Sequence, residues 1–164
     1  FMYYFIFSMY TGIRPSEARG IHRRDIRKDD KLGWVVDVKM VKDVSGTTLP
    51  RTLPLTEQAY SAYQKLDNGS VYPFAKFTKQ EIRKNWDWVR AASGHTHVAD
   101  KDFVFYLTRH TCASRMVQRG ISLAVVQKWM GHRTIQTTLI YAKLIPTNLL
   151  DARDALNSIK ENTL

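Results

Sequence analysis

The sequence predicts an α+β domain that is mainly helical, with one small antiparallel β-sheet. Most of the chain alternates apolar segments at helical spacing with capping residues and glycines, which is typical of short packed helices. One region is instead rich in β-branched residues and is followed by a turn and a second short apolar segment. A length of 164 residues with 44% hydrophobic residues suffices for one domain with its own core.

The first helix is expected at Phe1–Tyr10, which is apolar on almost every side and is therefore predicted to be buried. Gly12 is expected to end it, because glycine commonly lies just beyond a helix. Pro15 suits the first position of a second helix, and Glu17 then lies in the first turn, where a negative charge is favourable. Residues Gly20–Lys31 are polar, and we expect a loop there.

The sheet is expected to begin with Trp34–Val41, a segment rich in valine. Ser45-Gly46 predicts a turn, and Arg51–Leu55 predicts the returning strand. Pro54 has no N–H to donate to a neighbouring strand, which confines the returning strand to an edge or places the proline at its end.

The rest of the chain is predicted to be helical, apart from polar loops at residues 67–70 and 93–101. Threonine and serine suit the N-terminal caps of several of these helices, and glycine and proline suit their ends. The helices are expected at Thr56–Leu66, Thr78–Ala92, Leu107–Arg119, Ser122–Gly131, Thr134–Lys143 and, beyond Pro146, Asn148–Lys160.

Two features exclude whole classes of protein. Cys112 is the one cysteine, so neither an intrachain disulfide framework nor a multi-cysteine zinc site is expected. The apolar run at Phe1–Tyr10 is shorter than the ~20 residues that cross a bilayer, and it lacks the basic start of a signal peptide. Because the chain opens in what reads as the middle of a helix, we interpret residues 1–164 as a single domain excised from a longer protein.

The charge of the chain indicates an anionic partner. The formal net charge is +10 and the isoelectric point is about 9.8, which suits nucleic acid, although a protein can also be basic without such a partner. No acidic residue lies between Asp102 and Asp151. Solvated helices usually mix both signs, so this acid-free stretch favours neutralisation from outside the protein. The basic residues of the stretch are Arg109, Arg115, Arg119, Lys128, Arg133 and Lys143.

Four separated segments together form a specific pattern. They are T-G-x-R-x-S-E at residues 11–17, a lysine at position 42, R-H-T-x-A-S at residues 109–114, and G-H at residues 131–132. Tyr141 follows nine residues after His132. In order and spacing the pattern resembles the catalytic domain of the tyrosine recombinases, the phage integrase family, over essentially the whole chain. The resemblance implies the tyrosine recombinase catalytic-domain fold.

Arg14 and Arg109 match the two family arginines that bind the scissile phosphate. Guanidinium groups suit this role because they bind phosphate oxygens in pairs and stay charged. Tyr141 matches the nucleophile. A phenol ionises near pH ~10, so forming its anion at pH 7 costs ~4 kcal/mol and requires a base, a positive field, or both. The alternative is that Tyr141 is a core aromatic residue on an amphipathic helix.

The resemblance assigns two further groups. Lys42 matches the lysine of the family's hairpin, which protonates the departing 5′ oxygen. Lys39 is the competing candidate, but three residues along a strand its side chain points to the opposite face. His132 matches a histidine that donates to a phosphate oxygen. Alternatively, His132 is a helix-terminal histidine favoured by the helix dipole.

Position 106 departs from the family pattern. The family usually has a histidine three residues before the second arginine, acting as general base, whereas this chain has Tyr106. A phenol can orient the phosphate or relay a proton, but it is a poor base near pH 7. His132, His95 and His97 are the candidates for compensation. His110 is expected to be structural, because small residues suited to close helix packing follow it.

Neither a metal ion nor another cofactor is implied. Acidic residues are sparse near the arginines, and two arginines with a lysine supply the charge that a divalent ion would otherwise provide. No glycine-rich phosphate loop is present. Glu17 belongs to the family motif and is expected to support the fold or to orient Arg14, whereas Asp25 is expected to have no special role.

The resemblance implies a site-specific DNA recombinase, an enzyme that integrates or excises a mobile element or prophage through a 3′-phosphotyrosyl intermediate. A type IB topoisomerase, which shares the chemistry, and a non-enzymatic DNA-binding remnant are the alternatives. The implied partner is double-stranded DNA, bound by a homotetramer that is monomeric without DNA, with DNA-bending accessory proteins and no membrane. The implied location is the bacterial cytoplasm, at the nucleoid.

The C-terminal segment, residues 147–164, raises a separate question. Its apolar residues follow the spacing of one helical stripe, which docks either on its own domain or on a neighbouring protomer. The residues of that stripe are Leu149, Ala152, Leu156 and Ile159.

Overall fold

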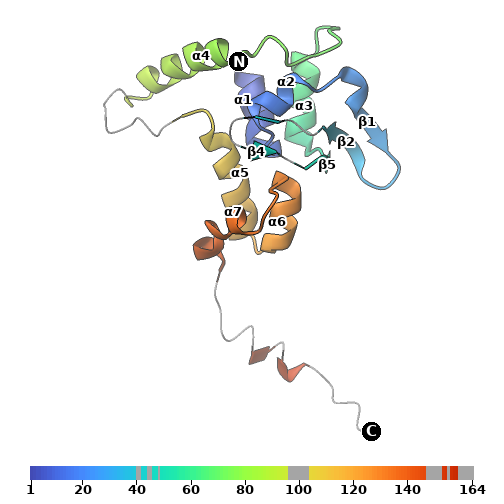
Figure 1. Cartoon of the computed structure of the whole chain (residues 1–164), viewed down its shortest axis with the longest axis vertical. Helices are drawn as coiled ribbons and strands as arrows, with labels where there is room; N and C mark the ends of the chain where they lie inside the picture. The colour runs from blue at the N-terminus through green and yellow to red at the C-terminus, as the bar shows by residue number, and fades with distance from the viewer. Residues whose placement is uncertain are drawn as a thin grey trace.

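The computed structural model describes residues 1–39, 49–95, 104–146, 153–154 and 156–158, and the backbone alone at 42–43 and 46–47. These residues are mainly helical with a small antiparallel sheet, as the sequence predicted, although the sheet has three strands rather than the two expected, and a separate two-stranded pair lies beside it in the chain. In Figure 1 the first four helices and the sheet form the upper part of the domain, and α5 (Leu107–Gln118), α6 (Leu123–Met130) and α7 (Gln136–Leu139) lie below them.

The predicted first helix is confirmed as α1 (Met2–Thr11), which is central to the larger of two hydrophobic clusters. Tyr4 is fully buried in this cluster, and its ring stacks on Phe77 at 4.2 Å and on Phe105 at 5.3 Å between centroids. Phe105 immediately precedes the segment that starts α5. The aromatic cluster therefore fixes the start of α5 against α1.

The segment after α1 is more ordered than the sequence suggested. α2 (Pro15–Arg19) begins at the predicted proline. The polar loop expected at Gly20–Lys31 is wrong, because this segment holds a 3₁₀ turn, η1 (Arg23–Asp25), and a strand, β1 (Ile26–Asp29). Only Ile26 of that strand is buried, so β1 exists through backbone pairing with its neighbour rather than through an apolar face.

The sheet has the order β1–β2–β5, with both pairs antiparallel. β2 (Gly33–Val38) ends earlier than the strand predicted at Trp34–Val41, and β5 (Arg51–Pro54) is the predicted returning strand. Pro54 is the last residue of β5, and β5 is an edge strand, as expected of proline. Between β2 and β5 in the sequence, β3 (Lys42–Asp43) pairs with β4 (Gly46–Thr47), and residues 44–45 lie outside the described part.

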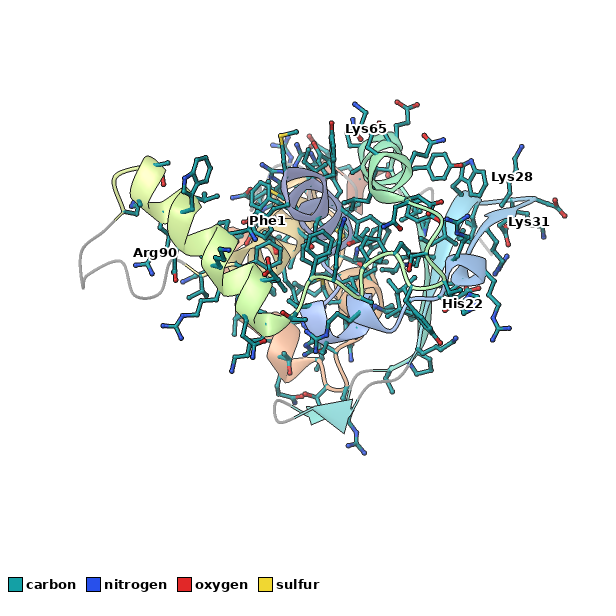
Figure 2. The ribbon with its side chains drawn as sticks, turned by 90° about the horizontal axis from the view of Figure 1, so that it is seen from above. Phe1, His22, Lys28, Lys31, Lys65 and Arg90 are labelled. Carbon is teal, nitrogen blue, oxygen red and sulfur yellow. The ribbon has the colours of Figure 1, made fainter. Side chains whose placement is uncertain are left out.

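Two predicted helices flank this core. α3 (Glu57–Leu66) packs alongside α1, and α4 (Lys79–Ala92) lies at the upper left of Figure 1. The hydroxyls of Thr56 and Thr78 cap these helices by accepting hydrogen bonds from backbone N–H groups three residues on. Figure 2 shows Arg90 of α4 on the side of the domain opposite Lys28 and Lys31 of the β1–β2 hairpin.

The last third of the domain packs around a second, smaller hydrophobic cluster. α5 and α6 lie close to the predicted bounds, with Ser122 capping α6. The continuous helix predicted at Thr134–Lys143 is wrong, because α7 ends at Leu139 and a 3₁₀ turn, η3 (Ala142–Leu144), follows. Tyr141 stands at the break between them and packs into the cluster. The other buried members of the cluster are Ala113, Val117, Val126 and Met130.

The predicted C-terminal helix falls mostly outside the described residues. Of its four stripe residues only Leu156 is described, and its side chain is 68% exposed. None of the described helices is long and apolar enough to cross a membrane. Within the described ranges, no three His, Cys, Asp or Glu side chains gather as metal ligands would.

Candidate active site

Arg109 lies where three segments of the chain meet. Its side chain projects from α5 and the residue is only 2% exposed. Nη1 donates to the Gly12 carbonyl at the end of α1 at 2.6 Å, and Nη2 donates to the Met130 carbonyl at the end of α6 at 2.5 Å. Carbonyl groups at helix C-termini carry partial negative charge, which suits a guanidinium. A guanidinium has five N–H donors, so these two bonds position the group without exhausting it.

The glycines of two motifs allow this close approach. Gly12 and Gly131 both have a φ of 66°, in the left-handed region that favours glycine. A Cβ at Gly12 would lie 3.0 Å from the Met130 sulfur, and one at Gly131 would lie 2.7 Å from Nη1 of Arg51. The glycines therefore end α1 and α6 and leave room for the side chains packed between these ends.

Arg14 lies at the N-cap of α2, next to the end of α1. Its backbone N–H donates to Oε2 of Glu17 at 2.8 Å, while its Nη1 is 4.0 Å from Oε1 of the same carboxylate. The Arg14 side chain is 12% exposed, and its Nε and Nη1 atoms have no hydrogen-bond partner among the described residues. Donors left in this way are costly unless a ligand satisfies them, so the geometry suits an anion with several acceptor oxygens.

Arg51 of β5 is a third arginine at the site that the sequence analysis missed. Its Nη1 and Nη2 donate to the two oxygens of the buried Glu17 carboxylate at 2.9 and 3.0 Å. Its Nε donates to the Trp129 carbonyl of α6 at 2.7 Å. The sequence held one signal of this position. Arg51 and the buried Leu53 lie two residues apart in the strand, so their side chains share its inward face.

The three guanidiniums surround one carboxylate and leave an excess of positive charge. Burial, followed by the charge of Arg14, lowers the pKa of Arg109 to about 10, so it remains a cation at neutral pH. The charge of Glu17 raises the pKa of Arg109, and the charge of Arg51 lowers it. The two non-bridging oxygens of a phosphodiester, which share one negative charge, would reduce this excess and accept hydrogen bonds from the remaining N–H groups.

His132 follows Gly131 and is buried. Its Nδ1 lies 2.8 Å from the hydroxyl of Thr138, which fixes the ring and leaves Nε2 as the nitrogen for a ligand. Burial, followed by the charges of Arg109, Arg14 and Arg51, lowers the pKa of His132 to about 4. His132 is therefore neutral at pH 7, and with Nδ1 accepting from Thr138 its Nε2 would carry the proton.

Tyr141 is 5% exposed, and its hydroxyl lies 2.8 Å from Nδ1 of His110. Burial raises the pKa of the phenol to about 12, against the opposing charge of Arg109. The phenol is therefore protonated at rest. The small residues that follow His110 predicted a structural role, but the structure brings its ring into contact with the hydroxyl of Tyr141. No local pattern indicated this contact, because the two residues lie 31 positions apart.

Tyr106 immediately precedes α5 and is 37% exposed. Its ring meets that of His110 edge to face, with centroids 5.4 Å apart. The backbone of Lys42 lies in the β3–β4 pair, and its side chain is outside the described part of the chain. The competing Lys39 pairs with Asp25 at 3.1 Å. Position 97 is not described, and His95 lies just beyond the C-terminal end of α4.

A groove of about 710 Å³ runs from Arg14 and Tyr106 along α4. It lies between α2, α4 and the segment before α5, and Trp86 and Phe105 form part of its floor. Five basic side chains line it against one acidic residue, Asp87, so the groove continues the positive charge of the arginine cluster. The basic residues are Arg14, Arg19, Lys79, Arg83 and Arg90.

Solved structures share this fold. An integrase of the transposon Tn1549, in complex with a circular intermediate DNA, matches with a TM-score of 0.68 at 18% identity, over 96% of this chain and 58% of that one. The catalytic domain of bacteriophage HP1 integrase matches with a TM-score of 0.65 at 20% identity, over 98% of this chain and 84% of that one. The fold is therefore that of an integrase catalytic domain.

The sequence comparison identifies the family. Residues 3–147 match the family model described as the phage integrase family, and the chain belongs to that family. The tyrosine recombinase XerA of Pyrococcus furiosus is 26% identical over 153 residues, which cover 92% of this chain and 52% of the relative. The chain spans about half the length of the curated relatives it matches.

Proposed function

We propose that the protein is a site-specific DNA recombinase that cleaves and rejoins DNA through a 3′-phosphotyrosyl intermediate. The observation that carries the proposal is the convergence of Arg14, Arg109 and His132, from three separate segments, around one positive site. The hydrogen-bond donors left over on Arg14 make that site suited to a phosphodiester. Membership of the phage integrase family and the likeness to integrase folds support it.

In the proposed reaction, Arg14 and Arg109 bind the two non-bridging oxygens of the scissile phosphate and stabilise the charge that develops on them. His132 adds a neutral donor through Nε2. The Tyr141 oxygen attacks phosphorus, and the bond to the 5′ oxygen breaks. Lys42 supplies the proton that this oxygen takes up. The phosphotyrosyl bond conserves the energy of the broken linkage, so the DNA can be rejoined without ATP.

The sequence-based prediction for assembly also belongs to this proposal. We infer that the protein is monomeric alone and forms a homotetramer on two duplexes with DNA-bending accessory proteins, and that the C-terminal segment docks either on its own domain or on a neighbouring protomer. A mobile element or prophage is the proposed substrate, since structural neighbours include integrases of a transposon and of a phage. The proposed site of action is the bacterial cytoplasm, at the nucleoid.

The test is the capture of a covalent adduct. The protein containing this chain is incubated with a pool of nicked duplexes whose arms are randomised, so that cleavage releases a short fragment and traps the enzyme on DNA. Trapped sequences are recovered and resynthesised as a defined substrate. We expect a protease-sensitive adduct that forms with the wild type and is abolished in Tyr141→Phe, which loses one oxygen but keeps the packing of the ring.

The outcomes separate the alternatives. An adduct with Tyr141→Phe would mean that another tyrosine attacks, and Tyr106 would be examined next. DNA binding without any adduct would identify a non-enzymatic DNA-binding protein. Relaxation of supercoiled plasmid through Tyr141, without strand exchange between two copies of the recovered site, would identify a topoisomerase.

A further inference from the structure

The hydroxyl of Tyr141 and the ring of His110 form a contact that the family pattern does not supply. His110 Nδ1 lies 2.8 Å from the Tyr141 oxygen, within hydrogen-bond distance. His110 lies in α5, and Tyr141 lies at the break between α7 and η3. The second hydrophobic cluster holds these two segments together. We propose that His110 is the general base that takes the proton from Tyr141, in place of the histidine that is absent at position 106. This inference rests on the proposed recombinase function.

The other candidates are less suited to the role. Nδ1 of His132 faces Thr138, and its Nε2 is the nitrogen assigned to the phosphate. Tyr106 contacts the His110 ring rather than carrying a basic group of its own. His95 follows α4, whose C-terminal end lies far from α7 in Figure 1. Among the described residues, His110 is therefore the basic side chain in contact with the nucleophile.

The charges around His110 suit a base that acts only on bound DNA. Burial and the neighbouring Arg109 lower the pKa of His110, so the ring is neutral near pH 7 and able to accept a proton. The other titratable groups that face it are Tyr106, Tyr141 and His132. Beside an unneutralised Arg109 an imidazolium would be unfavourable. A phosphate bound at the arginines adds negative charge, which raises the affinity of His110 for the proton.

His110 takes up one proton during cleavage and returns it during rejoining. The Tyr141 proton moves to His110 Nδ1, with the ring already carrying its other proton on Nε2. The freed electron pair on the Tyr141 oxygen forms the bond to phosphorus, and the 5′ oxygen leaves with a proton from Lys42. On rejoining, the 5′ hydroxyl returns its proton to Lys42 and attacks phosphorus. The departing Tyr141 oxygen then recovers its proton from His110.

The experiment measures the rate of adduct formation on the defined nicked substrate in the protein containing this chain. His110→Gln removes the basic nitrogen and keeps a polar side chain. We expect cleavage to slow by ~10²–10⁴-fold, the usual contribution of a general base. His95→Ala is the matched control and should cleave at the wild-type rate. Thermal melting and DNA affinity are recorded for both variants to separate a chemical defect from a folding defect.

A second change distinguishes a base from a positioning residue. A fluorinated tyrosine at position 141 has a more acidic phenol and depends less on a base. We therefore expect the loss caused by His110→Gln to shrink in this background, and we expect imidazole in solution to restore part of the rate of His110→Ala. An equal loss with tyrosine and with fluorotyrosine would overturn the proposal in favour of positioning.

A measurement on the unmutated site covers the case in which the variants do not fold. The cleavage rate should rise with pH and level off above the pKa that NMR reports for His110 in the DNA complex. A profile that breaks elsewhere would overturn the proposal. If His110→Gln formed the Tyr141-dependent adduct at an unchanged rate, the proposed role of His110 as general base would be overturned, while the proposed recombinase function would stand. The absence of any adduct with the wild type would remove both.

Discussion

Arg51 binds the Glu17 carboxylate with both arms of its guanidinium, at 2.9 and 3.0 Å, although 34 residues separate them. The pair is buried, and it ties β5 to α2. Since Arg51 also donates to the Trp129 carbonyl, α6 is held in the same arrangement. Glu17 in turn accepts the backbone N–H of Arg14. The Glu17 carboxylate thus fixes the start of α2, where Arg14 lies, and also holds β5 next to the end of α6.

Removing the charge of Glu17 should be strongly destabilising. In Glu17→Gln, Arg51 keeps a buried charge without its counter-ion, and Arg14 and Arg109 no longer have the attraction that offsets their repulsion. Loss of one partner of a buried pair typically costs about 3–5 kcal/mol. Chemical denaturation should show a loss of this order. Asp37→Asn, at the exposed pair with Arg27, is the control and should cost about 0–1 kcal/mol.

The double variant Glu17→Met with Arg51→Met tests this explanation. It removes the unpaired charge together with the pair, so its free energy of unfolding should recover relative to Glu17→Gln. If the double variant were no more stable than the single one, packing rather than charge would dominate at this position.

Inorganic phosphate should stabilise the folded protein by occupying the arginine cluster. A ligand that binds only the folded state raises the melting temperature as its concentration increases. Arg14→Ala should abolish most of this shift, because Arg14 offers buried donors that lack a partner among the described residues. Arg119→Ala, an exposed arginine at the end of α5, has the same change in net charge. An equal response in both variants would show that phosphate acts through general charge screening.

Acidification should destabilise the fold in part through His132. In the unfolded chain this histidine binds a proton near its ordinary pKa of about 6.5, whereas in the fold its pKa is about 4. Between these two values the unfolded state binds more protons, so the free energy of unfolding decreases as the pH falls from about 6.5 to about 4. The His132→Gln variant should show a shallower decrease over this window. Parallel pH profiles for the two proteins would contradict the assignment.

Thr138→Val should weaken the placement of His132 while leaving the volume of the residue nearly unchanged. The ring loses the hydroxyl that contacts Nδ1, and the expected cost in stability is about 0.5–1.5 kcal/mol. Cleavage should slow by roughly 10–10²-fold, because Nε2 no longer faces the phosphate in one fixed orientation. Thr138→Ser retains the hydroxyl and is expected to keep the wild-type rate. A similar loss with serine would point to the methyl group instead.

Tyr106→His restores the residue usual in the family. Because His110 already contacts Tyr141, we expect the cleavage rate to change by less than roughly tenfold, since general-base catalysis is then already in place. Rates on the defined nicked substrate decide the matter. An acceleration of ~10²-fold would mean that the base was missing and that the contact with His110 belongs to a resting arrangement only.

Local signals in the sequence were sufficient for most helices. Thr56, Thr78 and Ser122 cap helices where they were expected, and Gly12 and Gly131 end them, because capping depends on residues a few positions apart. β1 was not predictable in this way. Its residues are mostly polar, and the strand forms because β2 offers a complete set of backbone partners.

The candidate site was predictable where a motif specified a residue and not where a distant partner did. The structure brings the motif residues Arg14, Arg109 and His132 together near the ends of α1 and α6, and their catalytic roles stay predictions. Arg51 and His110 owe their places to Glu17 and Tyr141, which lie 34 and 31 residues away in the chain. Such pairs depend on tertiary packing, and periodicity or capping does not indicate them.

The position of Arg109 has a consequence for the choice of inactive variants. The same guanidinium that is proposed to hold phosphate also fastens the ends of α1 and α6 to each other. A substitution there would remove a structural clamp together with the chemistry, so an inert protein made at this residue would be a misassembled one. Tyr141→Phe is the better choice for a dominant-negative protein, one that still occupies its DNA site and blocks the active copies. This change removes a single oxygen and keeps the packing of the fold.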